Sequence, residues 1–475
     1  GFWHRPPASH KWRRPPGDVI LAPVPSPPLF AAVAALAALL VAPVRPHETG
    51  AERLHRKGVH CMEEIERRDC AIEHFEALLD ERTDQRELVT DGLLRLVKLY
   101  EKEDRPEDLK AALRRFWDAG KTDVRRGHLP YTARFLPRDF DIVFHAHVQR
   151  LMSAPLARQM DEVAEFVMTC DESRRQQLDD LRLLRKAEKK ARETGTDVQK
   201  AMSEVVAAEK KEAERRKQRA QARAAEGRPR PPEPVFVELC EVARALGDDS
   251  VAGWTRGAFG LSHADFRRSI AVLEIPDLAA KLADGERAGR LVAAGPNTWA
   301  IADRTYNKAA VQVAMFETGE LVLAPAALMP EIAANHARGR RTLLREVDKL
   351  IGGVPVDAGF FAVIGEAAMT ELGFRGSSKG RKSFLQLLLP HPEGLQLAGV
   401  AHDYFGLFLR MPTDTPLKAS ALVGLARKMI ETQADADPEA ADFLRLLDVT
   451  QATDKRALLL SYVLSRRQLE SLVLR

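Results

Sequence analysis

Two histidines separated by one residue, His145 and His147 in the segment FHAHVQR, are the first candidates for metal chemistry. A metal site needs several Cys, His or carboxylate side chains that converge on one point. On a helix these two side chains would point about 200° apart, whereas on a strand they would share a face. The surrounding pattern is helical and no third ligand adjoins them. We therefore expect both to be structural or surface histidines.

Other segments have residue types suited to ligand binding or catalysis. The glycine-rich segment 373–383 lacks the Gly-Lys spacing of a phosphate-binding loop, which favours a polar loop between strands. Ser262 is expected to cap the N-terminus of a helix. His402 and Asp403 fall at a predicted hairpin tip, and His391 lies between two prolines in a loop. The sequence therefore predicts no catalytic, cofactor-binding or metal-binding residue, and it disfavours an enzyme.

The four cysteines, Cys61, Cys70, Cys170 and Cys240, are too few to cross-link a chain of 475 residues. The pattern predicts that the first two lie in one helix, where their separation in sequence corresponds to about 13 Å. A disulfide needs Cα atoms within about 7 Å of each other. We expect all four to be small buried apolar residues rather than redox or metal-binding groups.

The composition is close to that of an average globular protein. Lys and Arg number 72 and Asp and Glu 68, which gives a net charge of +4, and 45% of residues are hydrophobic. These values exclude a fully disordered chain, a collagen-like fibre, a disulfide-dense mini-protein and a polytopic membrane protein. At about 150 residues per domain, the length predicts roughly three folding units.

The N-terminal region combines a stretch rich in Pro and Arg, 1–28, with an apolar stretch, 29–44. Proline at this density excludes helix and strand pairing, so 1–28 is expected to be a disordered arm. As a helix, 29–44 would reach about 24 Å, short of the ~30 Å hydrocarbon core of a bilayer. We expect a signal peptide or a membrane anchor helix here, with a buried Ala-rich helix as the alternative.

From residue 51 to about residue 121, apolar residues recur every three or four positions, which predicts amphipathic helices joined by short turns. Residues 120–170 are expected to add further helices. The segments CAIEHFEALLD (70–80) and LLRLVKLYEKEDRPEDLKAALRRFW (93–117) resemble tetratricopeptide (TPR-like) helical hairpins. The resemblance implies an all-α domain over 51–170 whose concave face binds an extended peptide of a protein partner.

The segment 171–233 contains no Phe, Trp or Tyr and has only a thin apolar stripe. Within it, 194–197 has the residues of a helix stop followed by a helix N-cap, which predicts a helical hairpin. Residues 210–230 hold nine Lys or Arg and three Glu. Because no aromatic residue or recognition motif accompanies this basic run, a solvated helical spacer ending in a Pro-rich linker is favoured over nucleic-acid binding.

From 234 to 475, strand patterns and helix patterns alternate. We expect strands at 298–303, 309–317, 321–325, 358–365, 384–389, 395–401, 404–411 and 455–464, and helices at 326–337, 341–352, 416–432 and 438–447. The order strand–strand–helix–helix–strand occurs twice, around 309–365 and 395–464. This predicts an α+β domain with an antiparallel sheet and an internal duplication.

Two parts of this region resemble the DUF3352-like α+β domains of bacterial envelope proteins. They are GLQLAGVAHDYFGLFLRMPTDTPLKASALVGLARKMI (394–430) and LRLLDVTQATDKRALLLSYVLSRRQLESLV (444–473). Domains of that type follow an N-terminal membrane segment and combine a strand hairpin, an Ala/Leu-rich helix pair and a closing strand. The resemblance implies no catalytic residue.

Taken together, these features predict a multidomain chain of TPR-like hairpins (51–170), a helical spacer (171–233) and an α+β domain (234–475). The first functional expectation is a non-catalytic scaffold or protein-interaction module of the cell envelope, anchored in a membrane or exported by 29–44. One alternative is a soluble cytoplasmic enzyme or small-ligand-binding protein with its site in 234–475. The other is a nucleic-acid-associated protein that uses 210–230. We expect a protein partner, no nucleic acid and no cofactor.

Overall fold

The computed structural model describes residues 48–81, 85–121, 131–160, 168–225, 235–265, 268–302, 311–338, 343–355, 357–369, 392–436, 441, 444 and 447–473. Those from Gly50 onward form one compact unit. Several predicted segments lie outside the described residues. They are the disordered N-terminal segment 1–28, the apolar segment 29–44, the strand 384–389 and the linker 226–233.

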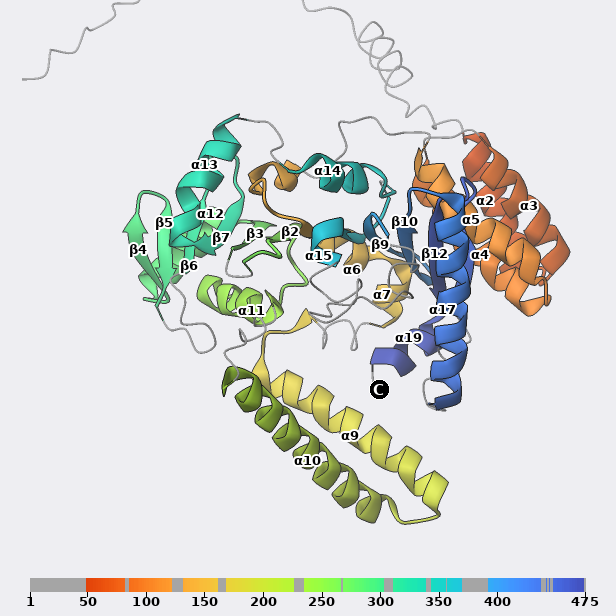
Figure 1. The fold of residues 1–475 in the computed structure, drawn as a ribbon, viewed down its shortest axis with the longest axis horizontal. Helices are drawn as coiled ribbons and strands as arrows, with labels where there is room; N and C mark the ends of the chain where they lie inside the picture. Colours follow the sequence, from red (N-terminus) through yellow and green to blue (C-terminus); the bar gives the residue numbers. More distant parts are fainter. Residues whose placement is uncertain are drawn as a thin grey trace, which may run out of the picture. The chain divides into compact units, whose positions relative to one another are not determined.

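A single antiparallel sheet of twelve strands is the central element, and this confirms the α+β class (Figure 1). Its order is β11-β12-β10-β9-β8-β1-β2-β3-β7-β6-β5-β4. The strands are β1 (Ile142–Ala146), β2 (Arg256–Leu261), β3 (Ser269–Glu274), β4 (Leu291–Gly295), β5 (Thr298–Ile301), β6 (Val311–Met315), β7 (Leu321–Pro325), β8 (Phe360–Gly365), β9 (Gly394–Ala401), β10 (Phe405–Pro412), β11 (Asp448–Gln451) and β12 (Ala457–Leu464).

Helices lie before, between and after these strands. They are α2 (Gly50–Glu63), α3 (Arg68–Asp80), α4 (Arg86–Lys102), α5 (Pro106–Lys121), α6 (Val148–Ser153), α7 (Pro155–Gln159), α9 (Glu172–Thr194), α10 (Val198–Ala225), α11 (Val235–Leu246), α12 (Leu278–Arg287), α13 (Met329–Arg338), α14 (Arg345–Gly352), α15 (Glu366–Met369), α17 (Pro416–Ala436) and α19 (Arg466–Val473). Short 3-10 turns occupy Tyr131–Phe135 and Ala326–Leu328.

The sheet has two halves with the same connectivity. β1 and β8 are neighbours and run antiparallel, with Phe144 opposite Ala362. From this pair the order is β1-β2-β3-β7-β6 in one direction and β8-β9-β10-β12-β11 in the other. Each half is a first strand, a hairpin, a helix (α12 or α17) and a second hairpin that pairs back on the first. The strand order of one half thus repeats that of the other outward from the β1–β8 pair, and the first half has two more strands, β4 and β5, between α12 and its second hairpin.

Successive side chains of a strand point to opposite faces of a sheet, and here they enter separate cores. On β3, Ile270 and Val272 belong to one core, whereas Ala271 and Leu273 belong to the other. The first core includes residues of α2–α5, α13 and α14, and the second includes residues of α11 and α12. α17 covers a smaller cluster that contains Leu458 of β12. The sheet is thus packed by helices on both faces.

The helices α2–α5 lie beside β10 and β12 (Figure 1), and their buried residues share a core with this second half of the sheet. The Phe116 ring of α5 stacks on the Phe408 ring of β10, with 3.7 Å between the ring centroids. α4 is buried along its whole middle, from Thr90 to Tyr100. Much of the apolar surface of these helices is therefore used inside the protein.

The strand β1 corrects the expectation that 120–170 is helical. Its residues pair with β2 on one side and β8 on the other, and they alternate between buried and half-buried. The consecutive residues Ile142, Val143 and Phe144 suit a pleated surface, and pairing on both sides outweighs the helical spacing around them. The sheet therefore begins inside the segment predicted to be helical.

The expectation of a transmembrane protein is also corrected. Among the described residues, no helix combines the length and apolar character required to cross a bilayer. The longest of them, α10, carries charged residues along its length. The transmembrane and membrane assignments are therefore wrong for the part of the chain that the structure describes.

Packing between β8 and β9 gives a test of the fold. Gly399 of β9 lies opposite Phe360 of β8, and a Cβ at Gly399 would overlap the Phe360 ring. Gly399→Ala should lower the free energy of unfolding by about 1–3 kcal/mol, the usual cost of overpacking. In α17, a Cβ at Gly424 would meet no atom within 4 Å, so Gly424→Ala should raise it by roughly 0.5–1 kcal/mol through helix propensity. Urea unfolding measures both, and a neutral Gly399→Ala would contradict this packing.

Candidate functional site

The two histidines of the H-x-H motif do not converge on a metal. His145 lies in β1, opposite Phe361 of β8, and its ring stacks on the Phe361 ring at 5.2 Å between centroids. His147 follows the strand and caps α6, where its Nδ1 accepts a hydrogen bond from the Arg150 amide. One histidine is therefore a core residue and the other is a helix cap.

Burial keeps the His145 imidazole neutral. Its Nε2 is buried without a hydrogen-bond partner among the described residues. This burial lowers the pKa of His145 to about 3, and the nearby charges of His147, Arg256 and Arg150 act in the same direction. The side chain therefore behaves as an aromatic core residue at neutral pH.

The remaining candidates from the sequence also have structural roles. Ser262 caps no helix: it lies in the β2–β3 hairpin, where its amide donates to the Arg268 carbonyl. His402 and Asp403 form the predicted turn between β9 and β10, closed by the His402 amide donating to the Tyr404 carbonyl. His391 and the segment 373–383 lie outside the described residues.

Arg95 of α4 is the buried centre of an ionic cluster that reaches the surface, here called the Arg95 cluster, with His55, Glu63, Asp91 and Asp403. The guanidinium donates to Asp91 Oδ2 at 2.8 Å and to Glu63 Oε1 at 2.7 Å, and it also pairs with Asp403. His55 Nε2 lies 2.6 Å from Asp91 Oδ2. Because the Arg95 side chain is only 7% exposed, this cluster fastens α2 and α4 to the β9–β10 turn.

Charge pairing within the Arg95 cluster changes the titration of its members. Burial acts to raise the pKa of Asp91, but the hydrogen bond from His55 and the charge of Arg95 leave it lowered. Burial raises the pKa of Asp403 despite the nearby Arg95 charge. Removing Arg95 or Asp91, which are both buried, would leave the other charge uncompensated, so we interpret their pairing as a specific attachment of the helices to the sheet.

The cysteines form two disulfides, which corrects the prediction of four separate thiols. Cys61 lies in α2 and Cys70 in α3, with their Cα atoms 5.7 Å apart. The predicted single helix is broken at 64–67, where Glu66 has a φ of 55° and the Arg67 amide donates to the Cys61 carbonyl. This turn contains neither Gly nor Pro, the residues that most often mark a break between two helices.

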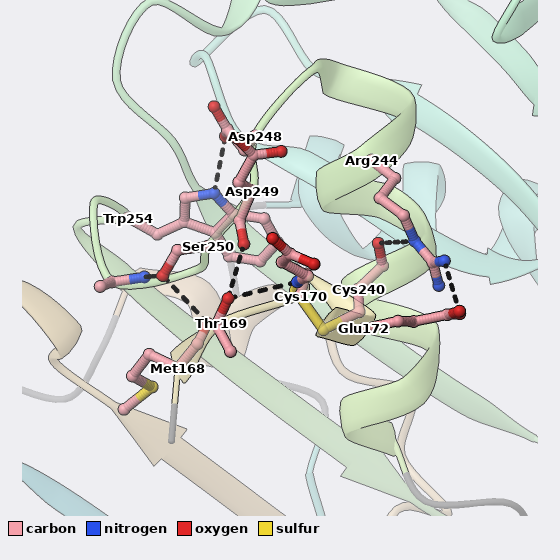
Figure 2. The surroundings of a disulfide bond; sticks show 12 residues. Met168, Thr169, Cys170, Glu172, Cys240, Arg244, Asp248, Asp249, Ser250 and Trp254 are labelled. Atoms are coloured by element: carbon pink, nitrogen blue, oxygen red, sulfur yellow. Dashed lines mark hydrogen bonds and ion pairs between the residues drawn. A yellow bond between two sulfur atoms is a disulfide. The ribbon is translucent and has the colours of Figure 1, made fainter. Parts of the chain in front are cut away.

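The second disulfide joins Cys170, just before α9, to Cys240 in α11 (Figure 2). Around it, the Cys170 amide donates to the Asp249 carbonyl at 2.7 Å. Arg244 of α11 donates to Glu172 of α9 at 3.3 Å. These bonds hold the start of α9 beside α11 and the loop that follows it.

α9 and α10 form an antiparallel helical pair, as the Thr194–Asp197 spacing predicts; we call this pair the arm (Figure 1). Gly195 adopts a φ of 66°, the left-handed conformation that ends many helices. A narrow seam of small residues lets the helices approach closely; it consists of Ala187, Ala191, Ala201 and Val205. Lys186–Glu209 (2.6 Å) and Lys190–Glu204 (2.8 Å) pair across it. The arm thus has its own small core.

The arm has no described counterpart in the second half of the sheet. The connection from β1 to β2 spans 147–255 and contains the arm, whereas the equivalent connection from β8 to β9 spans only 366–393. Both connections begin with a short helix, α6 or α15. Since the second half forms the same strand order through a much shorter connection, the sheet does not require the arm.

The surface of the arm is basic with exposed apolar positions. α9 and α10 hold sixteen Lys or Arg and nine Asp or Glu, whereas the whole chain has a net charge of +4. Lys210, Lys211 and Arg215 are exposed on α10. Leu181 and Leu184, three residues apart on α9, are 42% and 39% exposed. A basic surface with apolar anchors suits recognition better than catalysis.

No family model, curated protein or solved structure matches the chain. The resemblances to TPR-like repeats and DUF3352-like domains therefore stay predictions. The arm and the disulfide at its base are among the features of the described fold that the repeated sheet does not explain, and their basic, partly apolar surface makes them the candidate site.

Removing either disulfide tests its contribution to stability. The Cys170–Cys240 bond spans 70 positions and the Cys61–Cys70 bond spans nine. Chain-entropy estimates give a loss of about 4 kcal/mol for Cys170→Ala/Cys240→Ala and about 3 kcal/mol for Cys61→Ala/Cys70→Ala. Urea unfolding without reductant measures both losses. A larger loss for the short loop would contradict this ranking.

The buried His145 predicts acid sensitivity. Its unfolded pKa is about 6.5, and its folded pKa is about 3. Between these two pH values the unfolded chain binds a proton at His145 and the folded chain does not. The stability that the neutral His145 contributes is therefore lost as the pH falls from 6.5 towards 3. Between pH 7 and pH 4 the loss is about 3 kcal/mol.

His145→Phe should remove this pH-dependent part of the free energy of unfolding. His60→Ala, a substitution at an exposed position, should keep it. Urea unfolding of both variants and of the wild-type protein at the two pH values provides the measurement. Equal acid sensitivity of wild type and His145→Phe would show that another group is responsible.

Proposed function

We propose that this chain is a non-catalytic docking protein of an oxidising compartment outside the cytoplasm, and that the arm binds its protein partner. The observation that carries the proposal is that the arm occurs in one half of a repeated fold and is tied at its base by a disulfide. An element that the fold does not require is kept for another reason, and binding is the reason its surface favours.

We infer that the two halves of the sheet arose by internal duplication, because they share strand order and connectivity through five strands each. The repeat unit is then a strand, a hairpin, a helix and a second hairpin, and it begins at β1 rather than near residue 309. On this reading the arm is an insertion into the first copy.

The helices α2–α5 are proposed to be TPR-like hairpins, but with a different use from the one predicted. Their apolar residues share a core with β10 and β12, and the Arg95 cluster fixes them to the β9–β10 turn. Surface that is already buried against the sheet is not available to a peptide. This favours the arm over the helical repeats as the docking element.

The disulfides support a location outside the cytoplasm. Both pairs are closed and no cysteine is free. Disulfides persist in secreted and periplasmic proteins and are rare where glutathione and thioredoxin keep thiols reduced. We propose export on this basis.

The partner is proposed to be an acidic protein surface with apolar pockets. Positive charge on the arm would steer an acidic partner, and Leu181 and Leu184 would anchor it. The basic run alone would also attract nucleic acid, but the arm offers no aromatic side chain on which a base could stack.

Site-specific photo-crosslinking in cells that make the protein tests the proposal. A photoreactive residue at Leu184 should give one discrete protein adduct that resists nuclease. The charge-reversed variant Lys210→Glu/Lys211→Glu/Arg215→Glu should give about tenfold less adduct than the unchanged arm, because several favourable charge interactions become repulsive.

The same photoreactive residue at Val292, an exposed position on β4, serves as the control and should give no such adduct. Equal labelling from both positions, or an adduct that disappears on nuclease treatment, would refute docking of a protein on the arm. Thiol alkylation of acid-quenched cells checks the compartment: four modified cysteines would refute export.

A further inference from the structure

The Cys61–Cys70 disulfide has a histidine beside it. Cys70 and His74 lie four residues apart on α3, so one turn of helix brings their side chains to the same face. Cys61 reaches this face from the end of α2. The two sulfur atoms and one His74 ring nitrogen all lie within 4.8 Å of one another.

These three side chains are a converging set of metal ligands. Two thiolates and an imidazole are the donors that Zn²⁺ prefers, and in a tetrahedral site neighbouring donor atoms are about 3.5 Å apart. Opening the disulfide lets the sulfur atoms separate to that spacing without moving either helix far. The His74 ring makes no hydrogen bond or ion pair with another described residue, so its imidazole is not committed to another role.

We propose that the reduced form of this site, Cys61, Cys70 and His74, binds one Zn²⁺ ion, with water as the fourth ligand. Cys70 stands in the first turn of α3, where the helix N-terminus stabilises the negative charge of a thiolate. The site therefore has two forms that exclude each other, a closed disulfide and a metal-bound dithiolate.

The exchange between these forms is a two-electron reaction. A dithiol reductant gives two electrons and two protons to the Cys61–Cys70 bond and itself becomes a disulfide. Zn²⁺ then displaces the proton of each thiol, so binding releases two protons. Reduction is thus required before the metal can bind.

The second disulfide provides an internal comparison. Cys170 and Cys240 have no third ligand in a converging group among the described residues. Reduction of that pair should create no comparable site. The proposal therefore assigns zinc to one cysteine pair and not to the other.

The test uses the full chain, reduced with a phosphine, freed of reductant without oxygen and titrated with Zn²⁺ against a chromophoric chelator. The reduced protein should bind one Zn²⁺, and the oxidised protein none. Co²⁺ in its place should give a thiolate-to-cobalt charge-transfer band. His74→Ala should weaken binding at least tenfold, since even the loss of a supporting residue costs about 10–100-fold.

Cys170→Ser/Cys240→Ser is the matched control and should still bind one Zn²⁺ when reduced. Circular dichroism of the oxidised His74→Ala protein, which keeps both disulfides, checks that this variant is folded. Three outcomes would overturn the proposal: no stoichiometric Zn²⁺ on the reduced wild type, unchanged affinity in His74→Ala, or loss of the ion in the control.

Discussion

Pairing between β1 and β8 is the constraint on which the rest of the structure depends. It is the one junction between the two halves of the sheet, and it brings together residues more than two hundred positions apart. On its buried face, Val143 and His145 lie beside Phe361 and Val363. A register slip of one residue would turn these side chains to the opposite face and displace both cores together.

The helices and the sheet are joined by two different kinds of interaction. Apolar packing, such as the Phe116–Phe408 stack, buries apolar surface but does not fix the orientation of the helices on the sheet. The Arg95 cluster fixes this orientation, because the hydrogen bonds from one guanidinium to three carboxylates require a specific geometry. The arm takes part in neither of these: it has its own small apolar core, and the Cys170–Cys240 bond and the hydrogen bonds around it hold its base. This difference separates the part of the chain that maintains the fold from the part proposed to bind a partner.

Local patterns predicted most of the strands after residue 298, since 321–325 and 404–411 combine strand composition with nearby turn residues. The predictions that were wrong concern segments whose structure depends on distant partners or on a turn without marker residues. β1 is a strand because β2 and β8 lie on either side of it, and the α2–α3 break occurs at Glu66 without glycine or proline. The candidate site divides in the same way. The helical pair was predicted from 194–197, but the disulfides and the Arg95–Asp403 contact join segments whose proximity only the folded chain reveals.

The Cys170–Cys240 bond also determines what a cut at the far end of the arm would do. Scission beside Gly195 would leave one fragment carrying β1 and Cys170 and another carrying β2, β8 and Cys240. Those fragments would stay together as a two-chain molecule, joined by the sulfur bridge and by the ladders on both sides of β1. Such a cut would not separate the two fragments unless a reductant opened the disulfide. It would turn the loop at the tip of the arm into two free chain ends.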